Sequence, residues 1–159
     1  MAAKKRIRRQ EILAAAAEVI RRDGASALTM RRIAGQLGCS TQPLYSEFGS
    51  QEQLFEALPE YLQQTFLSAQ CGSYRDFGRL FLCFAEEEKE LFRFLYLRSR
   101  DPGQSRMEDA NWERTVGLLV RSLELDWEQA AEMHRRMQLY CYGLGAMIAI
   151  ELFEDGDHN

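Results

Sequence analysis

The stretch at residues 28–48, LTMRRIAGQLGCSTQPLYSEF, constrains the fold of this chain more than any other part of it. Thr29 is a good helix N-cap, and apolar residues follow it at helical spacing. Gly38 is expected to end that helix, because glycine adopts a positive φ without a clash of Cβ. Ser40 is expected to cap a second helix over residues 41–48, where Pro43 falls in the first turn and costs little. The stretch therefore predicts two short helices joined by a tight turn.

A longer helix, over about residues 7–23, is predicted before this pair. In the second helix of the pair, Leu44 and Phe48 are expected to face inward. A helix-turn-helix presents the first turn of its second helix to the major groove, so the outward side chains are candidates for base readout. Gln42 can bond an adenine edge, and the methyl group of Thr41 can contact that of a thymine. The apolar stripe of the longer helix consists of Ile12, Leu13, Ala16, Val19 and Ile20.

In their order and spacing, these residues resemble the DNA-binding half of the TetR family of bacterial transcription regulators, over roughly residues 6–60. The resemblance implies an all-α fold, with an N-terminal three-helix helix-turn-helix domain at 1–50 and a C-terminal helical ligand-binding and dimerisation domain at 51–159. Family members generally carry one further helix, so the second domain is expected to be short by one C-terminal helix. The matching positions are Leu28-Thr29, Ile33-Ala34, Leu37-Gly38-Cys39-Ser40, Leu44-Tyr45, Phe48-Gly49-Ser50 and Leu54.

Charge is distributed unevenly along the chain. The net charge is −4, yet residues 1–48 carry nine Lys or Arg and four Asp or Glu, which makes that part +5. The remainder, with eleven basic and twenty acidic residues, is −9. Such asymmetry suggests a basic contact surface on an acidic body. The N-terminal arm is expected to contact phosphates or a minor groove, in a manner weakened by salt.

Several other positions are candidate DNA contacts. The Thr29 end of its helix directs free N–H groups outward and suits an anion, with Arg31 beside it. Tyr45 matches a family tyrosine that resembles a phosphate contact; the alternative is a core aromatic with a surface hydroxyl. Gln51 stands where many family members have lysine, so it can donate a hydrogen bond without the charge. The expected DNA contacts are Lys4, Lys5, Arg6, Arg8, Thr29, Arg31, Ser40, Thr41, Gln42, Tyr45, Ser46 and Gln51.

Helical patterns continue through the second half of the chain. Its aromatic and methionine side chains can line a pocket for a small-molecule effector, or can simply fill the core. The last helix, capped by Asp126, is apolar on two faces, of which one is expected to meet the core and the other a partner chain. Its segment Tyr142-Gly143-Leu144 resembles the dimer helix of the family. Candidate pocket residues are Phe66, Phe77, Phe81, Phe84, Phe92, Tyr96, Trp112, Met137 and Tyr140; candidate dimer contacts are Leu139, Gly143, Ala146, Ile150 and Phe153.

The sequence carries no recognisable catalytic or metal-binding motif. It has two histidines, His134 and His158, and four cysteines without a CxxC spacing. We therefore expect no enzymatic activity, no cofactor and no metal. The absence of a signal peptide or a long apolar run indicates a cytoplasmic, bacterial protein with reduced thiols.

Together these features predict a DNA-binding transcriptional regulator, which the resemblance specifies as a repressor. It would act as a homodimer on a palindromic operator in double-stranded DNA and would be released by a small apolar or amphipathic ligand. The alternative is a protein-interaction module that keeps the fold without binding DNA. Glu47, Gln51 and the acidic second half favour that alternative, whereas the basic arm and the Thr41-Gln42-Tyr45 face oppose it.

Overall fold

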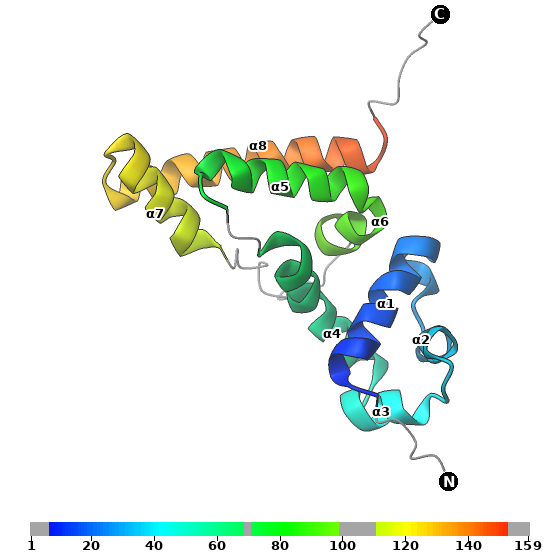
Figure 1. Ribbon diagram of the computed structural model, residues 1–159. Coiled ribbons are helices and arrows are strands. Elements are labelled where there is room, and N and C mark those ends of the chain that lie inside the picture. The colour runs from blue at the N-terminus through cyan, green and yellow to red at the C-terminus, as the bar shows by residue number, and fades with distance from the viewer. Residues whose placement is uncertain (1–6, 69–70, 99–110, 153–159) are drawn as a thin grey trace, which may run out of the picture. The chain divides into compact units, whose positions relative to one another are not determined.

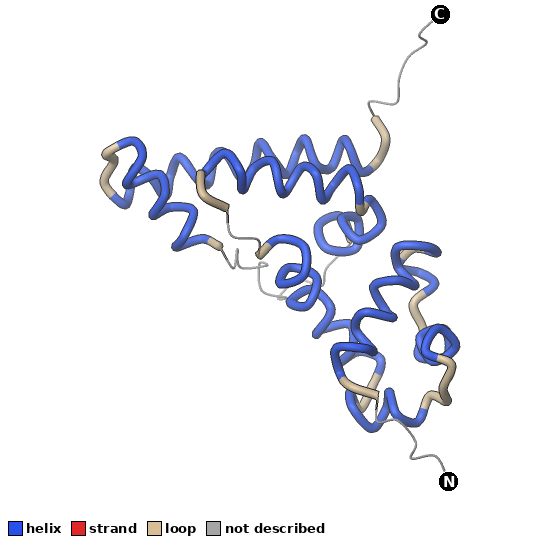
Figure 2. The backbone as a smooth tube through the Cα atoms, viewed as in Figure 1, coloured by secondary structure: helices blue, strands red, loops and turns tan. Residues whose placement is uncertain are grey.

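The computed structural model describes residues 7–68, 71–98 and 111–152, and all regular structure in these ranges is helical (Figures 1 and 2). Two compact units divide the chain, one ending at Leu62 and the other beginning at Gln63. None of the described helices is long and apolar enough to cross a membrane. The first unit contains α1 (Arg9–Asp23), a 3₁₀ turn (Ala25–Ala27), α2 (Met30–Leu37), α3 (Gln42–Phe48) and α4 (Gln51–Leu62). The second contains a π-helical turn (Gln63–Leu67), α5 (Tyr74–Glu87), α6 (Lys89–Phe92), a second π-helical turn (Arg93–Leu97), α7 (Trp112–Leu123) and α8 (Trp127–Ala149).

The core of the first unit forms around α1, which packs against α2 and α4. The apolar stripe predicted for this helix, Ile12, Leu13, Ala16, Val19 and Ile20, is buried throughout. Ile33 of α2, Leu44 and Phe48 of α3, and Leu54 and Leu58 of α4 are each at most 2% exposed. The helical spacing of apolar residues in the sequence thus identified the inward faces of α1, α2 and α3.

The two ends of α2 follow the prediction. The Thr29 side chain accepts a hydrogen bond from the backbone N–H of Arg32, and Gly38 adopts the left-handed conformation with φ 64°. The start of α3 differs from it, because Thr41 and not Ser40 occupies the N-cap position and makes no capping hydrogen bond with its side chain. Pro43 lies in the first turn, where its missing N–H has no intrahelical acceptor.

The first compact unit includes α4, whereas the division inferred from the sequence fell after residue 50. Leu54, Leu58 and Leu62 are fully buried along one face of α4, which contacts α1 and α3. Pro59 lies inside this helix and supplies no backbone N–H, and the helix changes to a π-helical turn at Gln63. The packing of α4 therefore places the end of the compact unit at Leu62.

The second unit is built on α5 and α8, which lie side by side (Figure 1). Ser73 and Asp76 form a capping box at the start of α5, and hydrogen bonding from Ser73 lowers the pKa of the Asp76 carboxyl below its usual value. Leu91 and Phe92 of α6 are fully buried beside α8. Asp126 caps α8 by accepting a hydrogen bond from the backbone N–H of Gln129.

The inward face of α8 is neither of the two apolar faces that the sequence suggested. Met133, Met137 and Tyr140 on one of these faces are 37%, 38% and 65% exposed, and Leu139 and Ile150 on the other are 74% and 53% exposed. Small residues and one histidine are buried in their place, because the large rings of α5 and α6 already occupy the space beside the helix. A Cβ on Gly145 would lie 2.6 Å from the ring of Phe92. The buried residues of α8 are Ala130, Ala131, His134, Gly145 and Ala149.

We predict that Gly145→Ala destabilises the protein by about 1–3 kcal/mol, since the added methyl group overpacks a filled site. Gly143→Ala is the matched control in the same helix, because a Cβ there meets no atom within 4 Å. Gly143→Ala should leave stability unchanged or raise it by up to about 1 kcal/mol through helix propensity. Urea unfolding followed by circular dichroism measures both, and equal effects of the two variants would contradict the packing described for α8.

Candidate nucleic-acid interface and ligand cavity

The solvent-facing side of α3 gathers most of the expected base contacts. Leu44 and Phe48 fix this helix to the core, so the side chains of Gln42, Tyr45 and Ser46 lie on its exposed face. Tyr45 is 48% exposed, which excludes the alternative of a core aromatic. An exposed row of an amide, a phenol and a hydroxyl can donate and accept hydrogen bonds at base edges and phosphates.

A hollow lies beside this face in the first unit. Ser40, Gln42 and Ser46 line it together with two carboxylates, Glu11 of α1 and Glu47 of α3. Thr41, at the N-cap position, is half-buried and does not line the hollow. The two carboxylates therefore add negative charge to the hollow that Gln42 lines.

The remaining expected contacts are dispersed around α1, α2 and α4. Arg8 occupies the N-cap position of α1 and is exposed, while Lys4, Lys5 and Arg6 lie outside the described residues. Thr29 and Arg31 are exposed at the start of α2. Gln51 is half-buried at the first position of α4.

The neighbouring Arg32 pairs with a carboxylate of the first unit. Its Nη1 atom lies 2.8 Å from Oδ2 of Asp23, which also accepts a hydrogen bond from Arg22 at 2.9 Å. Hydrogen bonding from Arg22 lowers the pKa of Asp23 below its usual value. Arg32 therefore connects α2 to the end of α1, whereas Arg31 is exposed at the start of α2.

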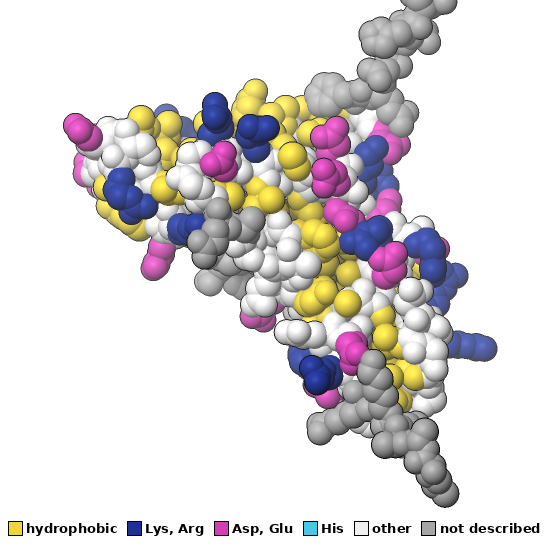
Figure 3. All heavy atoms as spheres, in the orientation of Figure 1, with side chains coloured by type: hydrophobic (Ala, Val, Ile, Leu, Met, Phe, Trp, Pro, Cys, Tyr) yellow, Lys and Arg dark blue, Asp and Glu magenta, His cyan; other side chains and the backbone are white. Residues whose placement is uncertain are grey.

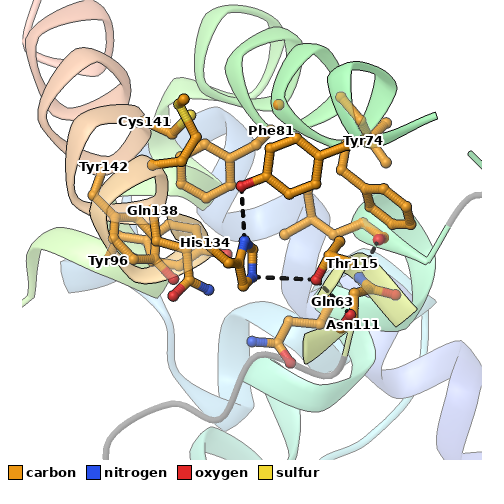
Figure 4. Close-up of a pocket in the computed structure, with 15 residues that line it drawn as sticks. Gln63, Tyr74, Phe81, Tyr96, Asn111, Thr115, His134, Gln138, Cys141 and Tyr142 are labelled. Atoms are coloured by element: carbon orange, nitrogen blue, oxygen red, sulfur yellow. Dashed lines mark hydrogen bonds between the residues drawn. The ribbon is translucent and has the colours of Figure 1, made fainter. Parts of the chain in front are cut away.

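The second unit contains a cavity of about 100 Å³ between α5, α7 and α8 (Figure 4). Of the predicted pocket residues, Phe77, Phe81, Tyr96 and Met137 line it. The ring of Phe81 lies 5.2 Å from that of Tyr96 and 5.1 Å from that of Tyr142, so one wall is continuously aromatic. The described residues that line it are Gln63, Leu67, Tyr74, Phe77, Gly78, Leu80, Phe81, Tyr96, Asn111, Thr115, His134, Met137, Gln138, Cys141 and Tyr142.

The other predicted pocket residues lie elsewhere in the second unit. Phe92 and Phe84 are core residues, 0% and 4% exposed, and Phe66 packs against Phe84 with ring centroids 5.3 Å apart. Trp112 packs behind the cavity against the ring of His134, whereas Tyr140 is exposed on α8. The sequence pattern could not separate core aromatics from cavity aromatics, because both recur at the same helical spacing.

The polar side of the cavity was missed by the sequence-based reasoning, and it centres on His134. Thr115 Oγ1 lies 2.7 Å from the backbone oxygen of Asn111 and therefore donates its proton to that acceptor. The same oxygen lies 3.1 Å from Nε2 of His134, so Nε2 carries a hydrogen and donates it to Thr115. Nδ1 then accepts from the Tyr74 hydroxyl at 2.9 Å. A hydrogen-bonded chain therefore runs from Tyr74 through His134 and Thr115 to Asn111 (Figure 4).

The candidate dimer contacts lie on the solvent side of α8. Leu139 and Ile150 are 74% and 53% exposed, Gly143 is exposed and Ala146 is half-buried. Phe153 lies outside the described residues. Figure 3 shows hydrophobic side chains between charged ones along the upper edge of the second unit, where α8 lies in Figure 1.

We predict that Thr115→Val lowers the stability of the protein by about 1–3 kcal/mol, because it leaves the buried Nε2–H of His134 without its acceptor. Thr115→Ser keeps the hydroxyl and loses only a methyl group, so it should cost about 0.8 kcal/mol. Urea unfolding of the two variants measures the difference. A valine variant as stable as the serine variant would show that the hydrogen-bonded chain does not hold this part of the core.

Comparison with known proteins adds a family match for the first unit. Residues 12–58 match a family model described as bacterial regulatory proteins, tetR family. The nucleoid occlusion factor SlmA of Vibrio cholerae serotype O1 is 34% identical over 116 residues, 67% of this chain and 54% of that protein. SlmA of Aliivibrio fischeri is 32% identical over 134 residues, 77% of this chain and 65% of that protein. The chain thus spans about half to two thirds of the length of these two relatives.

Two solved structures share the fold. The crystal structure of BioQ with its double-stranded DNA operator has a TM-score of 0.58 and 20% sequence identity, covering 92% of this chain and 88% of that one. A TetR variant from Acinetobacter baumannii AYE in complex with minocycline has a TM-score of 0.61 and 19% identity, covering 93% and 85%. At these identities the likeness shows the fold, which agrees with the all-α expectation.

Proposed function

The chain belongs to the tetR family of bacterial regulatory proteins, a family of DNA-binding regulators and not of enzymes, and we propose that it regulates transcription by binding operator DNA. The observation that carries this proposal is the exposed row of Gln42, Tyr45 and Ser46 on α3. Gln42 reads a base edge, while Tyr45, Thr29 and Arg31 position the domain on phosphates. The basic residues before α1 add a contribution that salt weakens.

The proposed regulator acts as a homodimer on a palindromic operator. Two recognition helices about 34 Å apart are needed to reach successive major grooves on one side of the duplex. The exposed apolar residues of α8, Leu139 and Ile150 among them, supply a surface for the second copy. Two-fold symmetry of the protein is then matched by two-fold symmetry of the site.

We further propose that the protein is a repressor whose release is triggered by a small molecule in the cavity of the second unit. The cavity is lined by α5, α7 and α8, so an occupant contacts three helices at once. A ligand changes the affinity for DNA only if it binds the DNA-free state better than the DNA-bound state. The solved TetR variant holds minocycline, which supports a ligand-responsive reading of this fold.

A second candidate function follows from the curated relatives, which are named nucleoid occlusion factors. If this chain had such a role, its DNA sites would not be confined to promoters. Chromatin immunoprecipitation of the tagged protein distinguishes the two: few peaks at promoters support the repressor, and many dispersed peaks support the nucleoid role.

We predict that Gln42→Ala weakens binding to the selected operator about tenfold or more, since a bidentate base contact contributes about 1–3 kcal/mol. Adding Tyr45→Ala should abolish specific binding while the circular dichroism spectrum is unchanged, because both side chains are exposed. The operator is first recovered by selection from random duplex DNA, and affinity is then measured by fluorescence anisotropy at two salt concentrations.

The matched control is Gln36→Ala, which makes the same chemical change at an exposed position of α2 outside the proposed contacts. It should bind the operator like the parent protein. Operator affinity that survives the double substitution at α3 would overturn the assignment of the interface. Recovery of no sequence motif, with weak binding that disappears as salt rises, would favour the interaction-module alternative.

A further inference from the structure

We propose that the cavity of the second unit takes a small, uncharged, single-ring aromatic molecule that carries a hydroxyl or N–H group. The ligand class deepens the proposed function, on which its regulatory meaning rests, but binding itself depends only on the cavity. Three properties of the lining determine the class: the lack of charge among its described residues, the shape and size of its aromatic wall, and the direction of the hydrogen bonds at its polar side.

The first property is the absence of ionised side chains. Among the residues that the structure describes, no Asp, Glu, Lys or Arg lines the cavity. The Cys141 thiol on the wall has a pKa raised by burial. A carboxylate or ammonium group brought into this site would lose its hydration without gaining a counter-charge. The described part of the lining therefore selects against ionised ligands.

The second property is the aromatic wall. Phe77, Phe81, Tyr96 and Tyr142 face the cavity from α5, the second π-helical turn and α8 (Figure 4). Aromatic rings pack against other rings in offset or edge-to-face arrangements, which contribute beyond the area that they bury. The volume of about 100 Å³ is of the same order as an engineered cavity of about 150 Å³ that holds benzene. A single six-membered ring therefore matches the space.

The third property is the hydrogen bonding of Tyr74. Its hydroxyl lies 2.9 Å from Nδ1 of His134 and donates its only proton to that nitrogen, since Nε2 of the same ring donates to Thr115. A hydrogen bond between the Tyr74 oxygen and an occupant therefore needs the occupant as its donor. A ligand that donates a hydrogen bond is complementary to this oxygen. A ligand that has only hydrogen-bond acceptors is not complementary to this oxygen.

Four probes of similar size test the three properties: benzyl alcohol, toluene, cyclohexylmethanol and benzoate. The chain has two tryptophans, so Trp127→Phe leaves Trp112, whose ring lies 5.0 Å from that of His134, as a fluorescent reporter beside the cavity. Benzyl alcohol should bind saturably and raise the melting temperature. Toluene and cyclohexylmethanol should each bind about threefold to tenfold more weakly, and benzoate at least tenfold more weakly.

Two variants connect the binding to this cavity. Tyr74→Phe should weaken the binding of benzyl alcohol about threefold to tenfold and leave the affinity for toluene unchanged, because it removes only the hydroxyl. Gly78→Leu should abolish binding of every probe without destabilising α5, since Gly78 faces the cavity and its Cβ would meet only the Cys141 sulfur, at 4.0 Å. Gly35→Leu is the matched control in α2, where a Cβ meets nothing within 4 Å, and should bind benzyl alcohol like the parent protein.

The proposal is overturned if benzoate binds as tightly as benzyl alcohol, if no probe binds, or if the Gly78→Leu variant still binds any of the probes. Operator binding is measured separately on the same preparation, with the DNA recovered by selection. Failure of operator binding with benzyl alcohol still bound would overturn the proposed function and support the ligand class. Operator binding in a protein that binds none of the four probes would support the proposed function and overturn the ligand class.

Discussion

The burial of Leu44 and Phe48 is the contact on which the candidate DNA interface depends. A helix of seven residues is not stable by itself in water, because its few hydrogen bonds do not offset the cost of nucleation. These two side chains, fully or almost fully buried, fix α3 to the core formed by α1 and α4. Once they are fixed, Gln42 and Tyr45 must face outward, since they lie on the other side of the same helix. The guanidinium of Arg9, 4.1 Å from the centre of the Phe48 ring, covers the end of this contact.

A single buried polar residue has the corresponding role in the second unit. His134 joins α5, α7 and α8 through Tyr74 and Thr115, and both of its ring nitrogens are satisfied. Among the described residues, no buried side-chain polar atom lacks a hydrogen-bond partner. Because a satisfied buried network fixes one arrangement of the helices around it, the same residues that hold the core together also define the polar side of the cavity. An occupant that bonds to Tyr74 would thereby contact the network that connects these three helices.

The similarity to known regulators is concentrated where the structure is most constrained. The family model matches residues 12–58, which contain the buried positions of α1, α2, α3 and most of α4. The cavity lies outside the matched residues, and its lining combines aromatic rings with amides, a histidine and a threonine. Fold and function are separable in this way, because a scaffold supports different ligands through the side chains of one site. Specificity for DNA and for a ligand therefore has to be derived from α3 and from the cavity individually.

The sequence by itself determined the features that depend on neighbours close in the chain. Helical spacing gave the inward faces of α1 to α3, and the capping residues gave both ends of α2 and the start of α8, because caps involve residues only three or four apart. Only the tertiary structure decided which face of α8 is buried, since the large rings of Phe81 and Phe92 leave room for small residues and not for the methionines. The tertiary structure also decided that Arg32 forms an ion pair with Asp23 and that His134 is hydrogen-bonded to Tyr74 and Thr115. Those partners are distant in sequence, and the pattern of apolar residues along one helix carries no information about which polar group packs across from it.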